Sequence, residues 1–196
     1  ISLKTSQPAQ QTNVDRYLKI LHDECQREID LITDLLDLTR LDGDVDPLIL
    51  TAIELETWLP AIVKPFVDRA QQQQQRLQID IAPALPPLMT EQSYLERILA
   101  ELLNNACKYT PAGEAIVIAA QQTRDHLQIN VTNTGVEIPV KEQALIFAKF
   151  YRIPNHDPWR QGGTGLGLAL VKKLAECLGA SINVESTHEK TTFILQ

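Results

Sequence analysis

The longest regular pattern in the chain is helical and runs from about Asn13 to Asp42, where apolar side chains recur every three or four residues. These side chains are Leu18, Leu21, Cys25, Ile29, Ile32, Leu35, Leu36 and Leu38. A helix of about 30 residues is about 45 Å long, which is more than one small domain can cover. We therefore expect this apolar stripe to pack in a helix bundle or a dimer.

A glycine and a proline divide the chain after this helix. The helical pattern stops at Gly43 and Pro47 follows, so we place a boundary between residues 1–46 and residues 47–196. Residues 5–12, which include Pro8 and three glutamines, are predicted to form a loop. Because the sequence begins with Ile1 and shows no signal peptide, we interpret it as a piece of a longer protein.

Charge and composition exclude two classes of partner. With 18 Lys and Arg against 25 Asp and Glu, the net charge of −7 argues against a nucleic-acid-binding protein. No apolar run reaches the ~20 residues that cross a bilayer, so we expect no membrane contact by this segment. The three cysteines are scattered without metal-ligand spacing, which is typical of a reducing compartment and predicts a cytoplasmic location.

Beyond Pro47, short alternating segments and helical segments succeed one another. The expected helices are Trp58–Gln75, Gln92–Tyr109 and one that begins near Gly165. The expected strands are Leu48–Leu55, Leu77–Ala82, Ala115–Ala120, Leu127–Asn133, Ile182–Glu185 and Thr191–Leu195. This order predicts an α+β fold, an α/β sandwich with a mixed sheet and its helices on one face.

A polar stripe marks the predicted helix Gln92–Tyr109. Glu101, Asn105 and Lys108 share one face, opposite the apolar residues of the same helix. Asparagine is unfavourable inside a helix, so the pair Asn104–Asn105 calls for an explanation. The stripe is either a solvated polar face or a metal–phosphate site, in which a carboxamide oxygen binds Mg²⁺ and the lysine neutralises phosphate.

Glycines mark two further candidate sites. Four glycines within residues 162–167 lead directly into a helix, where free backbone N–H groups and the helix dipole favour phosphate. The pattern is neither the dinucleotide-binding fingerprint nor the P-loop. At the end of the strand Leu127–Asn133, Asn133 and Gly135 form either a plain turn or a site where an amide binds a flat heterocycle.

The order of these motifs resembles the catalytic domain of bacterial sensor histidine kinases, part of the ATPase superfamily of gyrase, chaperones and mismatch-repair proteins. The motifs are Glu101-x-x-x-Asn105-Ala106-x-Lys108-Tyr109-Thr110, Asn133-x-Gly135-x-x-Ile138-Pro139, Phe147-x-x-Phe150-Tyr151-Arg152 and Gly163-x-Gly165-x-Gly167-Leu168. The resemblance implies a Bergerat ATP-binding fold over residues 47–196. It also implies that residues 1–46 are part of a dimerisation hairpin, mainly its second helix.

The resemblance further implies a role for each matching residue. Asn105 would bind Mg²⁺, Glu101 would polarise the nucleophile, and Asn133 would receive the adenine amino group. Gly135 would let the adenine ring pack closely. The remaining ATP-contacting residues would be Lys108, Tyr109, Ile138, Arg152, Gly163, Thr164, Gly165, Leu166, Gly167, Leu168 and Thr192. Residues 140–163 would form a lid that is anchored by Phe147 and Phe150, with Trp159 reporting its closure.

The implied activity is transfer of the γ-phosphoryl group of ATP to a histidine on the hairpin, for relay to a response regulator. The parent protein would be a homodimer through that hairpin. His22 precedes an acidic pair but lies on the second hairpin helix, so we expect the acceptor histidine to lie outside this sequence. The fragment is therefore not expected to phosphorylate itself.

Two residues depart from the family pattern. Asn133 replaces the usual Asp, which removes charge assistance from the adenine contact, and Glu137 replaces a usual glycine. These departures leave open a nucleotide-binding regulatory module without turnover. A related ATPase, in which Glu101 would activate water, is a further alternative.

Overall fold

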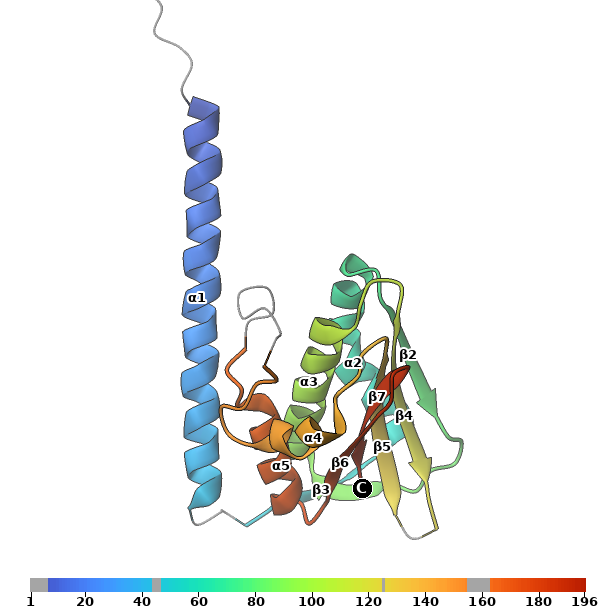
Figure 1. Ribbon diagram of the computed structural model, residues 1–196. Helices are drawn as coiled ribbons and strands as arrows, with labels where there is room; N and C mark the ends of the chain where they lie inside the picture. The colour runs from blue at the N-terminus through green and yellow to red at the C-terminus, as the bar shows by residue number, and fades with distance from the viewer. Residues whose placement is uncertain (1–6, 44–46, 125, 155–162) are drawn as a thin grey trace, which may run out of the picture.

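The computed structural model describes residues 7–43, 47–124, 126–154 and 163–196 (Figure 1). Helix α1, Gln7–Asp42, stands beside the rest of the chain and packs on it through α5, Gly167–Cys177. The prediction of a loop over residues 5–12 was wrong for residues 7–12, which are helical. Pro8 lies in the first turn, where its missing N–H breaks no helical hydrogen bond, and alanine and glutamine favour the helix.

Among the side chains of α1 that the structure describes, those that are buried lie in its C-terminal part. Leu38 and Leu41 join the core, whereas most of the apolar stripe above them is exposed. The exposed apolar residues of α1 are Val14, Tyr17, Leu18, Ile20, Leu21, Ile29, Ile32, Leu35 and Leu36. Their packing in a bundle or dimer stays a prediction, as does the division at residues 46 and 47. Within the described part of the chain, no helix has the length and apolar character needed to cross a membrane.

A five-stranded mixed sheet forms one layer of the fold and has the strand order β2-β4-β5-β7-β6. Its strands are β2 Arg76–Ile81, β4 Ala115–Gln122, β5 Leu127–Thr134, β6 Ile182–Ser186 and β7 Lys190–Leu195. The pair β2–β4 is parallel and the others are antiparallel. A separate antiparallel pair joins β1, Leu50–Ile53, to β3, Leu88–Glu91, a strand that the sequence did not predict.

Helices cover one face of this sheet, as predicted (Figure 1). They are α2 Leu55–Gln72, α3 Gln92–Tyr109 and α5, with a short helix α4 Val140–Gln143 and a 3-10 turn η1 Leu145–Phe147. The predicted α+β fold with a mixed sheet is therefore confirmed.

Successive side chains along β5 and β7 point to opposite faces of the sheet, and this determines which of them face the helices. Ile129, Val131 and Asn133 of β5 are buried on the inner face. In the register of β5 and β7, Asn133 pairs with Thr191, so Thr191 is on the inner face too. The next pair, Thr132 with Thr192, points to the opposite face, and the two hydroxyls are hydrogen-bonded at 3.0 Å.

Candidate functional site

One cavity, of about 210 Å³, lies where α3, the end of β5, the segment after it and the start of α5 meet. It is lined by most of the residues that the sequence singled out. These are Glu101, Asn105, Lys108, Tyr109, Asn133, Ile138, Arg152, Gly163, Thr164, Gly165, Gly167 and Leu168. The structure thus brings residues of all four motifs, which lie between Glu101 and Leu168 in the sequence, to one concave surface.

The two adjacent asparagines of α3 have different surroundings. Asn105 lines the cavity, whereas Asn104 accepts a hydrogen bond from Arg69 Nη1 of α2 at 2.8 Å. Asn104 therefore links two helices outside the cavity. Of these two adjacent asparagines, only Asn105 can offer its carboxamide oxygen to a ligand in the cavity.

Glu101 lies on α3 one turn before Asn105 and faces the first turn of α5. A Cβ added at Gly167 would meet Glu101 Oε2 at 2.5 Å, so only glycine allows this approach. Burial raises the pKa of the Glu101 carboxyl, while the charge of Arg97, at 3.4 Å from Oε1, opposes the rise. Glu101 is consequently a stronger proton acceptor than an exposed glutamate.

The Lys108 ammonium lies between an aromatic ring and the glycine-rich segment. Its Nζ is 4.6 Å from the centroid of the Tyr109 ring, a cation–π distance. A Cβ added at Gly163 would lie 2.6 Å from the same Nζ. The absence of a side chain at Gly163 therefore leaves space for the lysine to reach the backbone of this segment.

Gly165 packs closely against the backbone of Phe150. Its φ of +73° is in the left-handed region, and a Cβ there would lie 2.9 Å from the carbonyl carbon of Phe150. The N–H of Phe150 donates to the Gly165 oxygen at 2.9 Å. Both the backbone conformation and the close approach require glycine at this position.

The two phenylalanines predicted to anchor a lid differ in their environment. Phe147 packs edge-on against Phe193, with ring centroids 6.4 Å apart. The Phe150 side chain is 59% exposed, and its link to the site is made by its backbone. Trp159 lies outside the described residues, and the closing of a lid stays a prediction.

The Asn133 side chain lies near the end of β5 and forms part of the cavity wall. The residue is 4% exposed and lines the cavity. A side-chain amide carries both a donor and an acceptor, so it can pair with the polar edge of a ligand. Asn133 is therefore suited to binding a polar group of a ligand.

Three predicted residues do not line the cavity. Gly135 has a φ of +72°, and a Cβ there would meet the Glu114 side chain at 2.8 Å, so the turn itself favours glycine; its role beside a ligand ring stays a prediction. Leu166 is fully buried in the core. Thr192 faces the other side of the sheet, because side chains alternate along β7.

Thr191, and not Thr192, lies at the cavity. It is 1% exposed, donates to the Val136 oxygen at 2.8 Å and shares a hydrogen bond with Ser186 Oγ at 2.6 Å. Sequence analysis missed this residue although a signal was available. The inner position of Asn133 and its pairing with Thr191 determine which threonine faces the helices. The other lining residues that it did not assign are Ala106, Val136, Glu137, Ile146, Tyr151, Ile153 and Phe193.

Electrostatics and donor chemistry limit what the cavity can hold. Within residues 7–43, 47–124, 126–154 and 163–196, no group of three or more His, Cys, Asp or Glu side chains could bind a metal ion. A cation bound at Asn105 would need further oxygen ligands, which a bound anion can supply. The backbone amides at the start of α5 and the Lys108 ammonium suit such an anion.

Comparison with known proteins gives consistent matches. A family model described as "Histidine kinase-, DNA gyrase B-, and HSP90-like ATPase" matches residues 90–196. The circadian input-output histidine kinase CikA of Synechococcus elongatus is 31% identical over 173 residues, which cover 87% of this chain and 23% of CikA. Among the first curated relatives the chain spans 23–30% of their length.

Solved structures share the fold. Full-length ShkA in complex with AMPPNP has a TM-score of 0.80 and 22% identity, and the match covers 100% of this chain and 39% of ShkA. Histidine kinase ThkA in complex with the response regulator protein TrrA has a TM-score of 0.76 and 18% identity. That match covers 98% of this chain and 52% of ThkA.

Proposed function

Because the chain belongs to the histidine kinase-, DNA gyrase B- and HSP90-like ATPase family, we propose that its cavity binds Mg-ATP for transfer of the γ-phosphoryl group to a histidine. The chain is an ATPase domain of the histidine kinase type, homologous to sensor kinases. The observation that carries the proposal is the meeting of Asn105, Lys108, Asn133 and the glycine segment in one cavity.

The residues of the cavity fit the parts of a nucleotide. The amide of Asn133, which lines the cavity, suits the polar edge of adenine, without the charge assistance that a carboxylate would give. Lys108 and the amides that begin α5 suit the phosphates. Gly163 and Gly167 have no side chain to fill the space beside Lys108 and Glu101.

Magnesium would be held by Asn105 together with phosphate oxygens. This assignment fits the described residues, because the carboxamide of Asn105 lines the cavity beside Lys108, and no group of three or more His, Cys, Asp or Glu side chains among these residues could hold a metal ion. The bound ion would supply charge neutralisation at the phosphates. Lys108 adds a second positive charge from the same helix, one turn further on.

Phosphoryl transfer depends mainly on positioning and charge neutralisation, which these residues provide. Glu101 polarises the nucleophile in this proposal, and the raised pKa of its carboxyl suits a proton acceptor. The acceptor is a histidine on a hairpin helix that pairs with α1. His22 of α1 does not take this role in the proposal.

The partners and location follow from the same proposal. The parent protein forms a homodimer through the exposed apolar stripe of α1, acts in the cytoplasm, and relays phosphate to a response regulator. The complex of ThkA with TrrA supports the choice of partner, since ThkA shares this fold.

Calorimetric titration with AMPPNP, with and without Mg²⁺, tests the site. The adjacent asparagines give matched variants, because Asn105→Asp changes the cavity and Asn104→Asp changes a contact with Arg69. We expect Mg²⁺-dependent binding in the micromolar range for the unchanged chain, on the order of −8 kcal/mol. Asn105→Asp should change the affinity by about ten-fold or more, which is about 1.4 kcal/mol, and Asn104→Asp by less than about two-fold.

The absence of detectable binding at millimolar nucleotide would contradict the proposal. Equal effects of the two substitutions would contradict the assignment of Asn105.

A further inference from the structure

An aspartate of the long helix contacts two walls of the cavity. Asp34 is 5% exposed, although most of the described side chains of α1 are exposed. Its Oδ1 is 2.6 Å from Arg97 Nη2 of α3, and its Oδ2 accepts a hydrogen bond from Thr164 Oγ1 at 3.3 Å. One carboxylate thus joins α1 to α3 and to the glycine segment.

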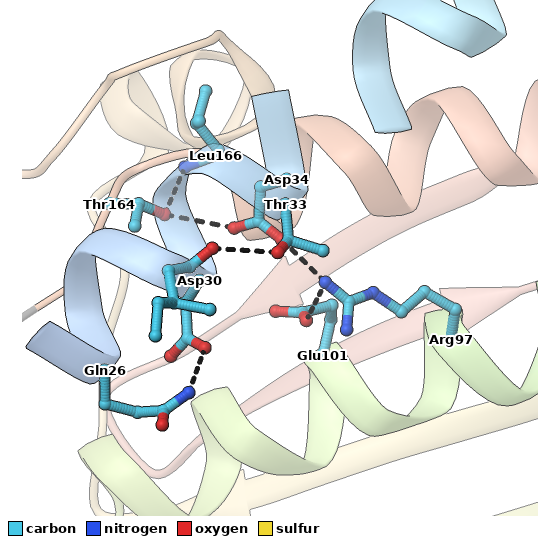
Figure 2. A network of polar contacts seen from close by, with 9 residues as sticks. Gln26, Asp30, Thr33, Asp34, Arg97, Glu101, Thr164 and Leu166 are labelled. Carbon is cyan, nitrogen blue, oxygen red and sulfur yellow. Dashed lines mark hydrogen bonds and ion pairs between the residues drawn. The ribbon is translucent and has the colours of Figure 1, made fainter. Parts of the chain in front are cut away.

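Both contacts lead directly to residues of the cavity. Arg97 Nη2 is also 3.4 Å from Glu101 Oε1, so the guanidinium bridges two carboxylates (Figure 2). Thr164 Oγ1 in turn accepts a hydrogen bond from the N–H of Leu166 at 3.2 Å, just before α5 begins. The position of α1 is therefore connected to Glu101 and to the start of α5.

The charges at this junction do not balance. Two carboxylates, Asp34 and Glu101, share one guanidinium, and Asp30 of α1 adds a further negative charge nearby. Burial raises the pKa of both shared carboxyls, which reflects the cost of keeping them charged there. A polyphosphate that entered the cavity would bring more negative charge to this junction.

The contact with Asp34 also occupies the hydroxyl of Thr164. Its hydrogen is donated to Asp34, so it cannot be donated to a phosphate oxygen while α1 is docked. A second contact keeps α1 in place, since Asp42 pairs with Lys149 at 2.9 Å and with Lys173 at 3.1 Å. This second contact involves none of the residues that line the cavity.

We propose that Asp34 is an electrostatic latch: docking of α1 through Asp34 and binding of nucleotide phosphates in the cavity oppose one another. The inference rests on the proposed nucleotide site and adds its regulation by α1. Because coupling between two binding events is reciprocal, nucleotide weakens the docking of α1 as much as docking weakens nucleotide binding. A nucleoside, which carries no phosphate, escapes this opposition.

Calorimetry with AMPPNP and with adenosine, both in Mg²⁺, tests the latch on the whole chain. Asp34→Asn removes the shared charge and keeps the shape of the side chain. Asp37→Asn, one turn further along α1, is the matched control for loss of one negative charge. We expect Asp34→Asn to bind AMPPNP about five-fold more tightly or better, the lower end of typical coupling, with adenosine affinity changed by less than about two-fold.

A second variant weakens the docking of α1 without changing any charge beside the cavity. Asp42→Asn weakens the distant contact with Lys149 and Lys173, and it should also tighten AMPPNP binding. The distance between spin labels at exposed positions 26 of α1 and 172 of α5, in a background with Cys25 and Cys177 replaced by serine, reports docking. AMPPNP should lengthen this distance, and adenosine should leave it unchanged.

The possible failures are distinguishable. If the unchanged chain binds AMPPNP and Asp34→Asn binds it equally or more weakly, the latch is refuted and the nucleotide site stands. An equal gain in Asp37→Asn would also refute the latch, because it would show a general effect of charge. If neither AMPPNP nor adenosine binds to any variant, the proposed function fails and the latch fails with it.

Discussion

Replacing Gly165 with alanine should disturb the site through two separable effects. The first is the left-handed backbone, with φ of +73°, which costs a residue with a Cβ about 1–2 kcal/mol. The second is contact, because the new Cβ would lie 2.9 Å from the carbonyl carbon of Phe150. Non-bonded carbons settle at about 3.5–4.0 Å, so the two backbone segments must separate by about 0.5 Å or more.

That separation strains the hydrogen bond from the Phe150 N–H to the Gly165 oxygen, which is worth about 0.5–1.5 kcal/mol. The free energy of unfolding should therefore fall by about 3 kcal/mol in Gly165→Ala. For a chain of this size, 1 kcal/mol corresponds to about 2–4 °C, so the melting temperature should drop by about 6–12 °C.

Gly179→Ala is the matched control for the first effect alone. Gly179 has φ of +70°, and a Cβ there would meet no atom within 4 Å. Its melting temperature should fall by about 3–6 °C, half the loss expected for Gly165→Ala. Scanning calorimetry measures both values, and titration with AMPPNP should show weaker binding only for Gly165→Ala. Equal loss of stability in the two variants would refute the contact with Phe150 as the reason for glycine at this position.

Three further predictions follow from the same structure. Thr191→Val should weaken AMPPNP binding and lower the free energy of unfolding by about 1–3 kcal/mol, because the Val136 oxygen loses its buried donor; similar losses in Thr192→Val would contradict the inner position of Thr191. Leu102→Ala should cost about 2–5 kcal/mol in denaturant unfolding, against about 0.5 kcal/mol or less for Ile49→Ala, which is 75% exposed, and comparable costs would contradict the assigned core. Since burial raises the folded-state pKa of Glu101, the unfolded chain releases this proton at lower pH, and stability falls as pH rises from the unfolded to the folded pKa. Glu101→Gln should flatten that part of the pH dependence in denaturant unfolding, and an unchanged profile would contradict the raised pKa.

Periodicity predicted the long helices α1, α2, α3 and α5 and most strands, because apolar residues recur along one face of each. It did not predict the short helix α4 or the turn η1. It failed at the start of α1, where Pro8 is harmless in a first turn. It also failed at β3, Leu88–Glu91, a short strand after a proline-rich stretch. That strand exists because it pairs with β1, more than 30 residues earlier in the chain, a contact that no local pattern reveals.

The candidate site was largely predictable from the types and spacing of its residues. The prediction differed from the structure in which side chains of a segment face the cavity. Asn105, Lys108 and the glycines were recognisable by residue type and spacing, and the structure places them on one cavity. Thr192 was assigned from the family resemblance, whereas the register of β5 and β7 places Thr191 on the inner face. The contact of Asp34 with Thr164 spans 130 residues and depends on how α1 docks, so the sequence gives no sign of it.

Amide hydrogen exchange with and without Mg-AMPPNP tests most directly the claim that three separate segments form one nucleotide site. The account predicts slower exchange in residues 101–110, 133–138 and 163–168 together, with residues 76–81 of β2 unchanged as an internal reference. Protection confined to one of these segments, or absent from all three at saturating nucleotide, would contradict the account.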